Sequence, residues 1–305
     1  MKLTIGYITA RRQPCLEWFV DSLRKQIRPG DQIQILLVDF LHGERDLSSL
    51  RLDSAGQLTL RSVPCKPTVW QGPHRLTKDN WWAKSAYLNT AACLCETEWL
   101  ATVDDRCLVR DGHLDGIRRA MEGRYAVAGW YEKRFDMEVE DGVIVKPGTV
   151  VGTDPRHWSA EGGEPVVAPG GWFFGANIAL PVEWVFDVNG WDETCDSLGL
   201  EDCIFGSMLE TIGRPIRYDA KLAIIEDRTP SACEPPLAKR TDKGLSPADK
   251  SHGLLHRVFG KSQATHDLDL RELREMVRRG EPFPIPTSPT HDWWDGQPLT
   301  EFQGS

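Results

Sequence analysis

Apolar runs of strand length alternate with segments of helical spacing over most of the chain. Strand-like patterns occur at Leu3–Thr9, Ile33–Val38, Leu58–Val63, Trp99–Val103, Tyr125–Trp130, Phe173–Leu180 and Ile216–Glu226. Apolar residues three or four positions apart predict helices over residues 14–27, 80–95, 111–121, 201–212 and 268–279. Strands that alternate with helices predict an α/β fold with parallel strand pairs.

Two stretches lack this regular alternation. Residues 131–169 are predicted to be irregular, with a hairpin turn at Asp141-Gly142, and a segment of this length is expected to wrap a site. Residues 228–251 are polar and rich in proline and charge, which predicts a linker. A short helix is predicted at 254–259, before the amphipathic one at 268–279. The sequence thus predicts a domain over 1–228 and a C-terminal extension of helices, loops and a proline-rich tail over 229–305.

Composition narrows the class of protein. The chain has 305 residues, is 40% hydrophobic and contains 12 tryptophans, enough for a substantial core. Its net charge of −9 argues against general nucleic-acid binding, because proteins that bind nucleic acid in this way usually have more Lys and Arg than Asp and Glu. We find no apolar stretch of membrane-spanning length and no signal peptide. The eight cysteines form no CxxC pair, so we expect reduced thiols in a cytoplasmic protein.

Two pairs of adjacent acids stand at the ends of predicted elements. Asp104-Asp105 follows the strand Trp99–Val103, and Glu201-Asp202 begins a helix. Carboxylates at the end of a buried strand are costly to desolvate unless a cation is near, and ligands bind at this edge of open α/β sheets. The first pair could instead be a solvated turn, and the second a simple helix cap. We favour a functional site for both.

In their order and spacing, several segments resemble the family-2-like branch of the GT-A glycosyltransferases. The matching segments are Thr4-Ile-Gly-Tyr-Ile-Thr-Ala-Arg11, Leu36-Leu-Val-Asp39, Lys84 to Ala92, Val103-Asp-Asp-Arg106, Gly175-Ala-Asn-Ile-Ala-Leu180, Asn189-Gly-Trp-Asp-Glu193 and Leu200-Glu-Asp202. Each match is weak alone, and together they span roughly residues 3–226. The resemblance implies a GT-A fold, with a Rossmann-like mixed sheet flanked by helices.

The resemblance also implies an activity and a set of site residues. The activity is transfer of a sugar (hexosyl transfer) from a nucleotide-sugar donor, UDP-linked in our interpretation, to an acceptor hydroxyl, with inversion. Asp202 would be the catalytic base and Glu201 would orient the acceptor. Donor contacts would come from Thr9, Arg11, Asp39, Lys84, Asp104, Asp105, Arg106 and Trp172. Asp39 could equally be a satisfied strand-end acid, Arg11 and Lys84 solvated charges, and Trp172 a core residue.

The sequence departs from the family pattern at the metal motif. Asp104 and Asp105 could bind Mn²⁺ or Mg²⁺ through oxygen ligands, but Arg106 stands where the family has an acid. The strand that ends at Glu226 also lacks the histidine that often completes the site. Two versions remain open: His252 folds back as a ligand beside Asp104 and Asp105, or Arg106 partly replaces the cation.

The acceptor and two other functions stay open. The acceptor could be a glycan, a small molecule, a protein or a hydroxylated DNA base, and seven Lys and Arg residues within 228–261 could face DNA. A nucleotidyltransferase also uses paired acids, but Thr9-Ala-Arg-Arg stands where a glycine-rich phosphate loop would be. A non-catalytic nucleotide-sugar binder is the third possibility, and Arg106 is its best argument.

Overall fold

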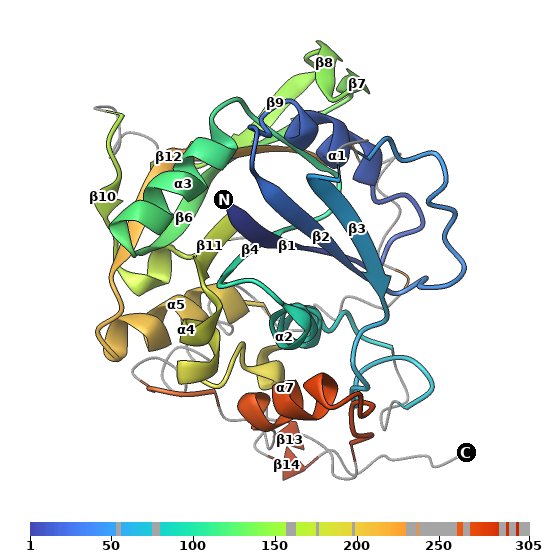
Figure 1. The fold of residues 1–305 in the computed structure, drawn as a ribbon, viewed down its shortest axis with the longest axis vertical. Coiled ribbons are helices and arrows are strands. Elements are labelled where there is room, and N and C mark those ends of the chain that lie inside the picture. The colour runs from blue at the N-terminus through green and yellow to red at the C-terminus, as the bar shows by residue number, and fades with distance from the viewer. Residues whose placement is uncertain are drawn as a thin grey trace.

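The computed structural model shows a central sheet between two layers of helices (Figure 1). It describes residues 1–52, 56–74, 80–156, 163–174, 177–196, 199–229, 237, 261–264 and 269–286, and the backbone of 291–292 and 297–298. His252, Gly175-Ala176 and the helix predicted at 254–259 lie outside the described residues. Within the described part, no helix is long and apolar enough to cross a membrane.

The main sheet has ten strands in the order β10-β12-β6-β11-β4-β1-β2-β3, with β5 added to β12 and β9 to β6. The strands are β1 Lys2–Thr9, β2 Gln32–Asp39, β3 Leu58–Val63, β4 Trp99–Val103, β5 Cys107–Val109, β6 Ala126–Phe135, β9 Thr149–Thr153, β10 Val166–Val167, β11 Asn177–Pro181 and β12 Ile216–Asp227. Strands β4, β1, β2 and β3 are parallel, whereas β11 runs antiparallel to β4 and β6. This confirms the mixed α/β sheet.

The helices cover both faces of the sheet, and each face has its own core. Their bounds are α1 Leu16–Arg24, α2 Lys84–Leu94, α3 His113–Gly123, α4 Val182–Asp187, α5 Glu201–Thr211 and α7 Leu270–Arg278, with 3₁₀ turns η2 Gly170–Trp172 and η3 Glu193–Cys195. Helices α1 and α3 pack on one face. Helices α2, α4, α5 and α7 pack on the other, so α7 of the C-terminal extension joins the main core.

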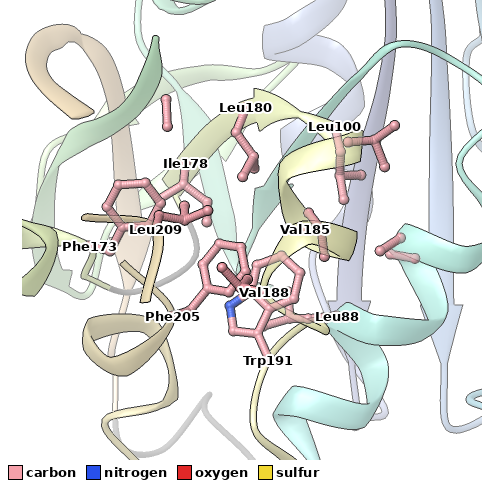
Figure 2. Close-up of a cluster of buried hydrophobic side chains, with 14 of the residues drawn as sticks. Leu88, Leu100, Phe173, Ile178, Leu180, Val185, Val188, Trp191, Phe205 and Leu209 are labelled. Atoms are coloured by element: carbon pink, nitrogen blue, oxygen red, sulfur yellow. The ribbon is translucent and has the colours of Figure 1, made fainter. Parts of the chain in front are cut away.

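The core under α2, α4 and α5 fixes these helices relative to one another. Trp191 stacks on Phe205 of α5 with ring centroids 4.0 Å apart, and Leu88 of α2 lies in the same cluster (Figure 2). Gly170 and Gly206 let η2 touch α5, because a Cβ on Gly170 would lie 2.2 Å from the Gly206 carbonyl oxygen. The first residues of α2 and α5 are therefore held by rigid packing.

Residues 131–153 are more regular than the sequence predicts. Strand β6 continues to Phe135 and pairs with β9, and the expected turn at Asp141-Gly142 joins a separate hairpin of β7 Glu138–Glu140 and β8 Val143–Lys146. Both turn residues have positive φ, the hairpin geometry that Asp-Gly favours. A last small pair, β13 His291–Asp292 and β14 Gln297–Pro298, lies in the tail.

At α2, α3 and β11 the observed start differs from the sequence prediction. Helix α2 begins at Lys84 because Trp81 is still extended, its amide donating to the Trp70 carbonyl. Helix α3 is preceded by Gly112, with a left-handed backbone and no side-chain cap, so Asp111 is not its cap. Strand β11 starts at Asn177 and not at Phe173.

Candidate functional site

The parallel strands β1, β2 and β4 end at one edge of the sheet, and their last residues carry most of the predicted site. Thr9 ends β1 beside Asp39 of β2, and Asp104-Asp105 follows β4. Helices α2 and α5 bring Lys84 and Glu201-Asp202 to the same place, as the contacts below show. The structure thus joins residues that lie up to 193 positions apart in the sequence (Thr9 to Asp202).

Asp105 is tied to the loop after β1. Its carboxylate accepts hydrogen bonds from Thr9 Oγ1 at 2.7 Å and from Arg11 Nε at 3.2 Å. Burial raises the pKa of Asp105, outweighing the opposite effects of Arg11 and the Thr9 hydrogen bond. This arrangement places one guanidinium and one hydroxyl beside the strand-end acids.

Lys84 connects the two acid pairs. Its Nζ lies 3.5 Å from Asp104 Oδ1, 3.1 Å from Glu201 Oε1 and 2.9 Å from Asp202 Oδ2. Burial alone would lower the pKa of Lys84, but the three carboxylates outweigh it and hold the pKa well above its usual value. Lys84 is therefore a protonated ammonium between the strand edge and α5.

Asp202 has the features of a general base. Desolvation raises its pKa to about 6, with Glu201 and Asp104 adding to the rise and Lys84 opposing it. Its Oδ2 accepts from Lys84, whereas its buried Oδ1 has no hydrogen-bond partner among the described residues. A buried acceptor left unpaired costs free energy that a hydroxyl ligand would recover.

A second carboxylate cluster positions α2. Asp196 accepts from the backbone amides of Ser85 at 2.6 Å and Ala86 at 3.3 Å, and so caps the helix that carries Lys84. Glu193 of η3 is paired with the buried Lys66 at 2.8 Å. Glu193, the last residue of the predicted acceptor segment Asn189–Glu193, is therefore held in an ion pair within the protein. Neither Asp196 nor Lys66 was among the predicted site residues, since their partners are distant in sequence.

Two residues predicted to contact the donor, Arg106 and Asp39, form ion pairs within the protein. Arg106 has a left-handed backbone (φ 57°) and its guanidinium binds Asp227 and the Gln13 carbonyl, beside Trp18 of α1. Arg106 therefore lies beside α1, and its contact with a diphosphate stays a prediction. Asp39 is 1% exposed and accepts two hydrogen bonds from Arg45, at 2.5 and 2.9 Å, and one from the Leu41 amide.

Trp172 is half-buried in η2, next to α5. It packs edge-on against Tyr218, with ring centroids 5.9 Å apart, and its carbonyl accepts from Arg156. Arg156 is itself buried and forms a two-point ion pair with Asp154, at 2.8 and 2.6 Å. Arg156 was not expected from the sequence, because it lies in a segment predicted to be irregular.

A cavity of about 1100 Å³ opens beside Asp39, comparable with small-molecule sites of roughly 300–1,000 Å³. It lies between the segment after β3, Tyr87 of α2 and residues 281–285 of the extension. Its walls are largely apolar, with Phe40, Tyr87, Met276, Phe283, Ile285 and the prolines 64, 67, 73, 282 and 284. Gln71 also lines it, and its Nε2 has no hydrogen-bond partner among the described residues.

No family model and no curated protein matches the chain. Its structure is similar to solved glycosyltransferases. The Staphylococcus aureus TarS fragment 1-349 with UDP has a TM-score of 0.53 and 13% identity, and the match covers 75% of this chain and 61% of that one. The chain has the GT-A fold. GalNAc-T7, solved with UDP, GalNAc and Mn²⁺, has a TM-score of 0.52 and 12% identity over 95% of this chain and 59% of its own. The chain thus spans about three-fifths of the length of these GT-A structures.

GalNAc-T7 was solved with Mn²⁺, which raises the question whether the residues at this site could bind a divalent cation. Among the described residues, no cluster of three or more His, Cys, Asp or Glu side chains could hold a metal ion. Asp105 is bound to Thr9 and Arg11, and the Lys84 ammonium lies against Asp104, where a second cation would be repelled. The described residues therefore do not fit a metal centre, and His252 lies outside them.

Proposed function

We propose that the chain is a glycosyltransferase that moves a sugar from a nucleotide-sugar donor to an acceptor hydroxyl, with inversion and with Asp202 as the base. The observation that carries this proposal is the Lys84 ammonium, held between the strand-end Asp104 and the Glu201-Asp202 pair. Such a centre offers positive charge to a leaving diphosphate on one side and a carboxylate to an acceptor on the other.

The donor diphosphate is proposed to lie at the ends of β1 and β4. Arg11 and Lys84 supply the charges there, and the Thr9 hydroxyl is a further polar group. Adjacent strands are about 4.8 Å apart, so Asp39 on β2 lies about 10 Å from the acids after β4. A nucleoside that extends from the diphosphate would reach the cavity at Asp39. UDP is the proposed nucleotide because TarS and GalNAc-T7 were solved with it.

The acceptor hydroxyl is proposed to approach α5. Asp202 Oδ1, buried and unpartnered among the described residues, would take the hydroxyl proton as the oxygen attacks the anomeric carbon. The bond from that carbon to the diphosphate breaks, and Lys84 and Arg11 stabilise the departing negative charge. Glu201 would orient the acceptor, and Trp172, beside α5, would form a wall for a sugar ring.

A panel of nucleotide sugars read by thermal shift tests this proposal. We expect one UDP-linked sugar to raise the melting temperature, because a ligand that binds only the folded state stabilises it. Arg11→Met should weaken that binding roughly 10- to 100-fold, the loss of one hydrogen-bonded charge. Arg12→Met is the matched control, because Arg12 is the next residue in the chain and its side chain is exposed. A panel without any hit, or equal affinity in both variants, would contradict the proposed donor site.

Metal dependence is a separate prediction. Because Arg11 is already paired with Asp105 and Lys84 lies against Asp104, we expect EDTA to leave donor binding unchanged and added Mn²⁺ to leave the melting temperature unchanged. The measurement is isothermal titration of donor before and after chelation. Donor binding that disappears with EDTA and returns with Mn²⁺ would show a metal site completed from outside the described residues, with His252 the first candidate.

A further inference from the structure

One side chain contacts both proposed substrate sites. Lys84 Nζ touches Asp104 on the donor side and Glu201 and Asp202 on the acceptor side. We infer that Lys84 couples the two sites, because a bound donor diphosphate draws its ammonium away from Asp202 and leaves both carboxylate oxygens of Asp202 open to the acceptor. This inference rests on the proposed function and adds to it a coupling between the two substrate sites through one side chain.

The local structure allows the side chain to move while the helix stays in place. Asp196 caps the first turn of α2, and Leu88 anchors the next turn in the core. Lysine carries a compact charge on a flexible four-carbon stem, so Nζ can move several ångströms without any change in the backbone. A diphosphate at Asp104 and Arg11 would offer this ammonium several charged acceptor oxygens in place of one Asp202 oxygen.

The charges around Asp202 decide the consequence of that movement. Among the described residues, Lys84 from α2 is the cation in contact with Asp202, and Arg156 acts on the adjoining Cys203, whereas Glu201 from α5 and Asp104 from the end of β4 are negative. When Lys84 turns to the diphosphate, burial and the two acids remain, and all three raise the pKa of Asp202 above its donor-free value of about 6. At fixed pH a raised pKa means more bound proton, so donor binding should be accompanied by proton uptake.

Titration calorimetry at pH 6.5, in two buffers of different ionisation heat, measures this uptake directly. The probes are UDP-GlcNAc and GDP-mannose, whose diphosphate esters do not titrate at this pH. Because the pKa of Asp202 rises above about 6 when Lys84 leaves it, the wild-type protein should take up a fraction of a proton per donor bound. Asp202→Asn should bind the same probe without uptake. Lys84→Met should bind more weakly and also without uptake, because it lacks the ammonium that moves from Asp202 to the diphosphate.

Each outcome is decisive. Binding by the wild type without proton uptake would overturn the coupling and leave the proposed function standing. Uptake that persists in Lys84→Met would assign the effect to the field of the diphosphate and also overturn the coupling. If neither probe binds the folded wild type, the proposed donor site fails and the coupling fails with it. The melting temperatures of both variants show whether each is folded. If Lys84→Met does not fold, the comparison of wild type with Asp202→Asn tests the coupling.

Discussion

Asp202→Asn is expected to lower the rate of sugar transfer about 10³-fold, within the range for the loss of a general base. The amide keeps the shape of the side chain but cannot accept the hydroxyl proton. Because Asp202 does not belong to the proposed diphosphate contacts, donor affinity should change little. Release of nucleoside diphosphate measures the rate, and titration calorimetry measures the affinity. Glu122→Gln, an exposed carboxylate on α3, is the matched control and should have wild-type turnover.

The pH profile provides an independent readout of the same residue. A base must be ionised, so the rate at low donor and acceptor concentration should rise with pH and level off above the pKa of about 6. The rise should be absent from the residual activity of Asp202→Asn. Wild-type turnover in this variant, or an unchanged profile, would remove Asp202 from the base role and leave Glu201 as the candidate.

Among the substitutions proposed here, Arg156→Met should destabilise the protein most. We expect it to lower the free energy of unfolding by about 3–5 kcal/mol. The substitution leaves the Asp154 carboxylate buried without its two-point partner and frees the carbonyl of Trp172. The measurement is urea unfolding. Arg278→Met is the matched control, because its ion pair is exposed and should contribute less than about 1 kcal/mol.

A double variant, Asp154→Asn with Arg156→Met, separates the buried charge from lost packing. Removing the carboxylate's charge should recover part of the stability, because an uncompensated buried charge is the main cost. If the double variant is less stable than Arg156→Met alone, the packing of Arg156 against Trp172, Phe174 and Tyr218 dominates instead.

The parts of this structure that depend on local pattern were predictable from the sequence. Strand-length runs of apolar and β-forming residues predicted β1, β2 and β4, and the resemblance placed Thr9, Asp39 and Asp104 at one donor site. The start of α5 at Glu201 also followed from local periodicity. The resemblance to GT-A transferases agreed with the fold, although identity to the solved structures is only 12–13%.

The parts that depend on distant contacts were not predictable. Lys84 faces Asp202 because Asp196, 111 residues after Ser85, fixes where α2 begins. Arg106 was assigned to the diphosphate from its place in the motif, but its left-handed backbone and Asp227 direct it to the α1 face. The ion pair of Asp39 with the half-buried Arg45 was not expected either, and a contact of Asp39 with the nucleotide stays a prediction. Such pairings follow from tertiary packing, which periodicity does not encode.

Phosphorus NMR of the protein with the nucleotide sugar that binds it tests the central claim most directly. The account predicts that the sugar–phosphate bond breaks, so the spectrum gains a nucleoside diphosphate, and that Asp202→Asn binds the same donor but forms this product about 10³-fold more slowly. Cleavage between the two phosphates, which yields a nucleoside monophosphate, would contradict the account and point to nucleotidyl chemistry. Binding without any cleavage, even with a panel of glycan, small-molecule, protein and hydroxylated-DNA acceptors, would contradict it in favour of a non-catalytic binder.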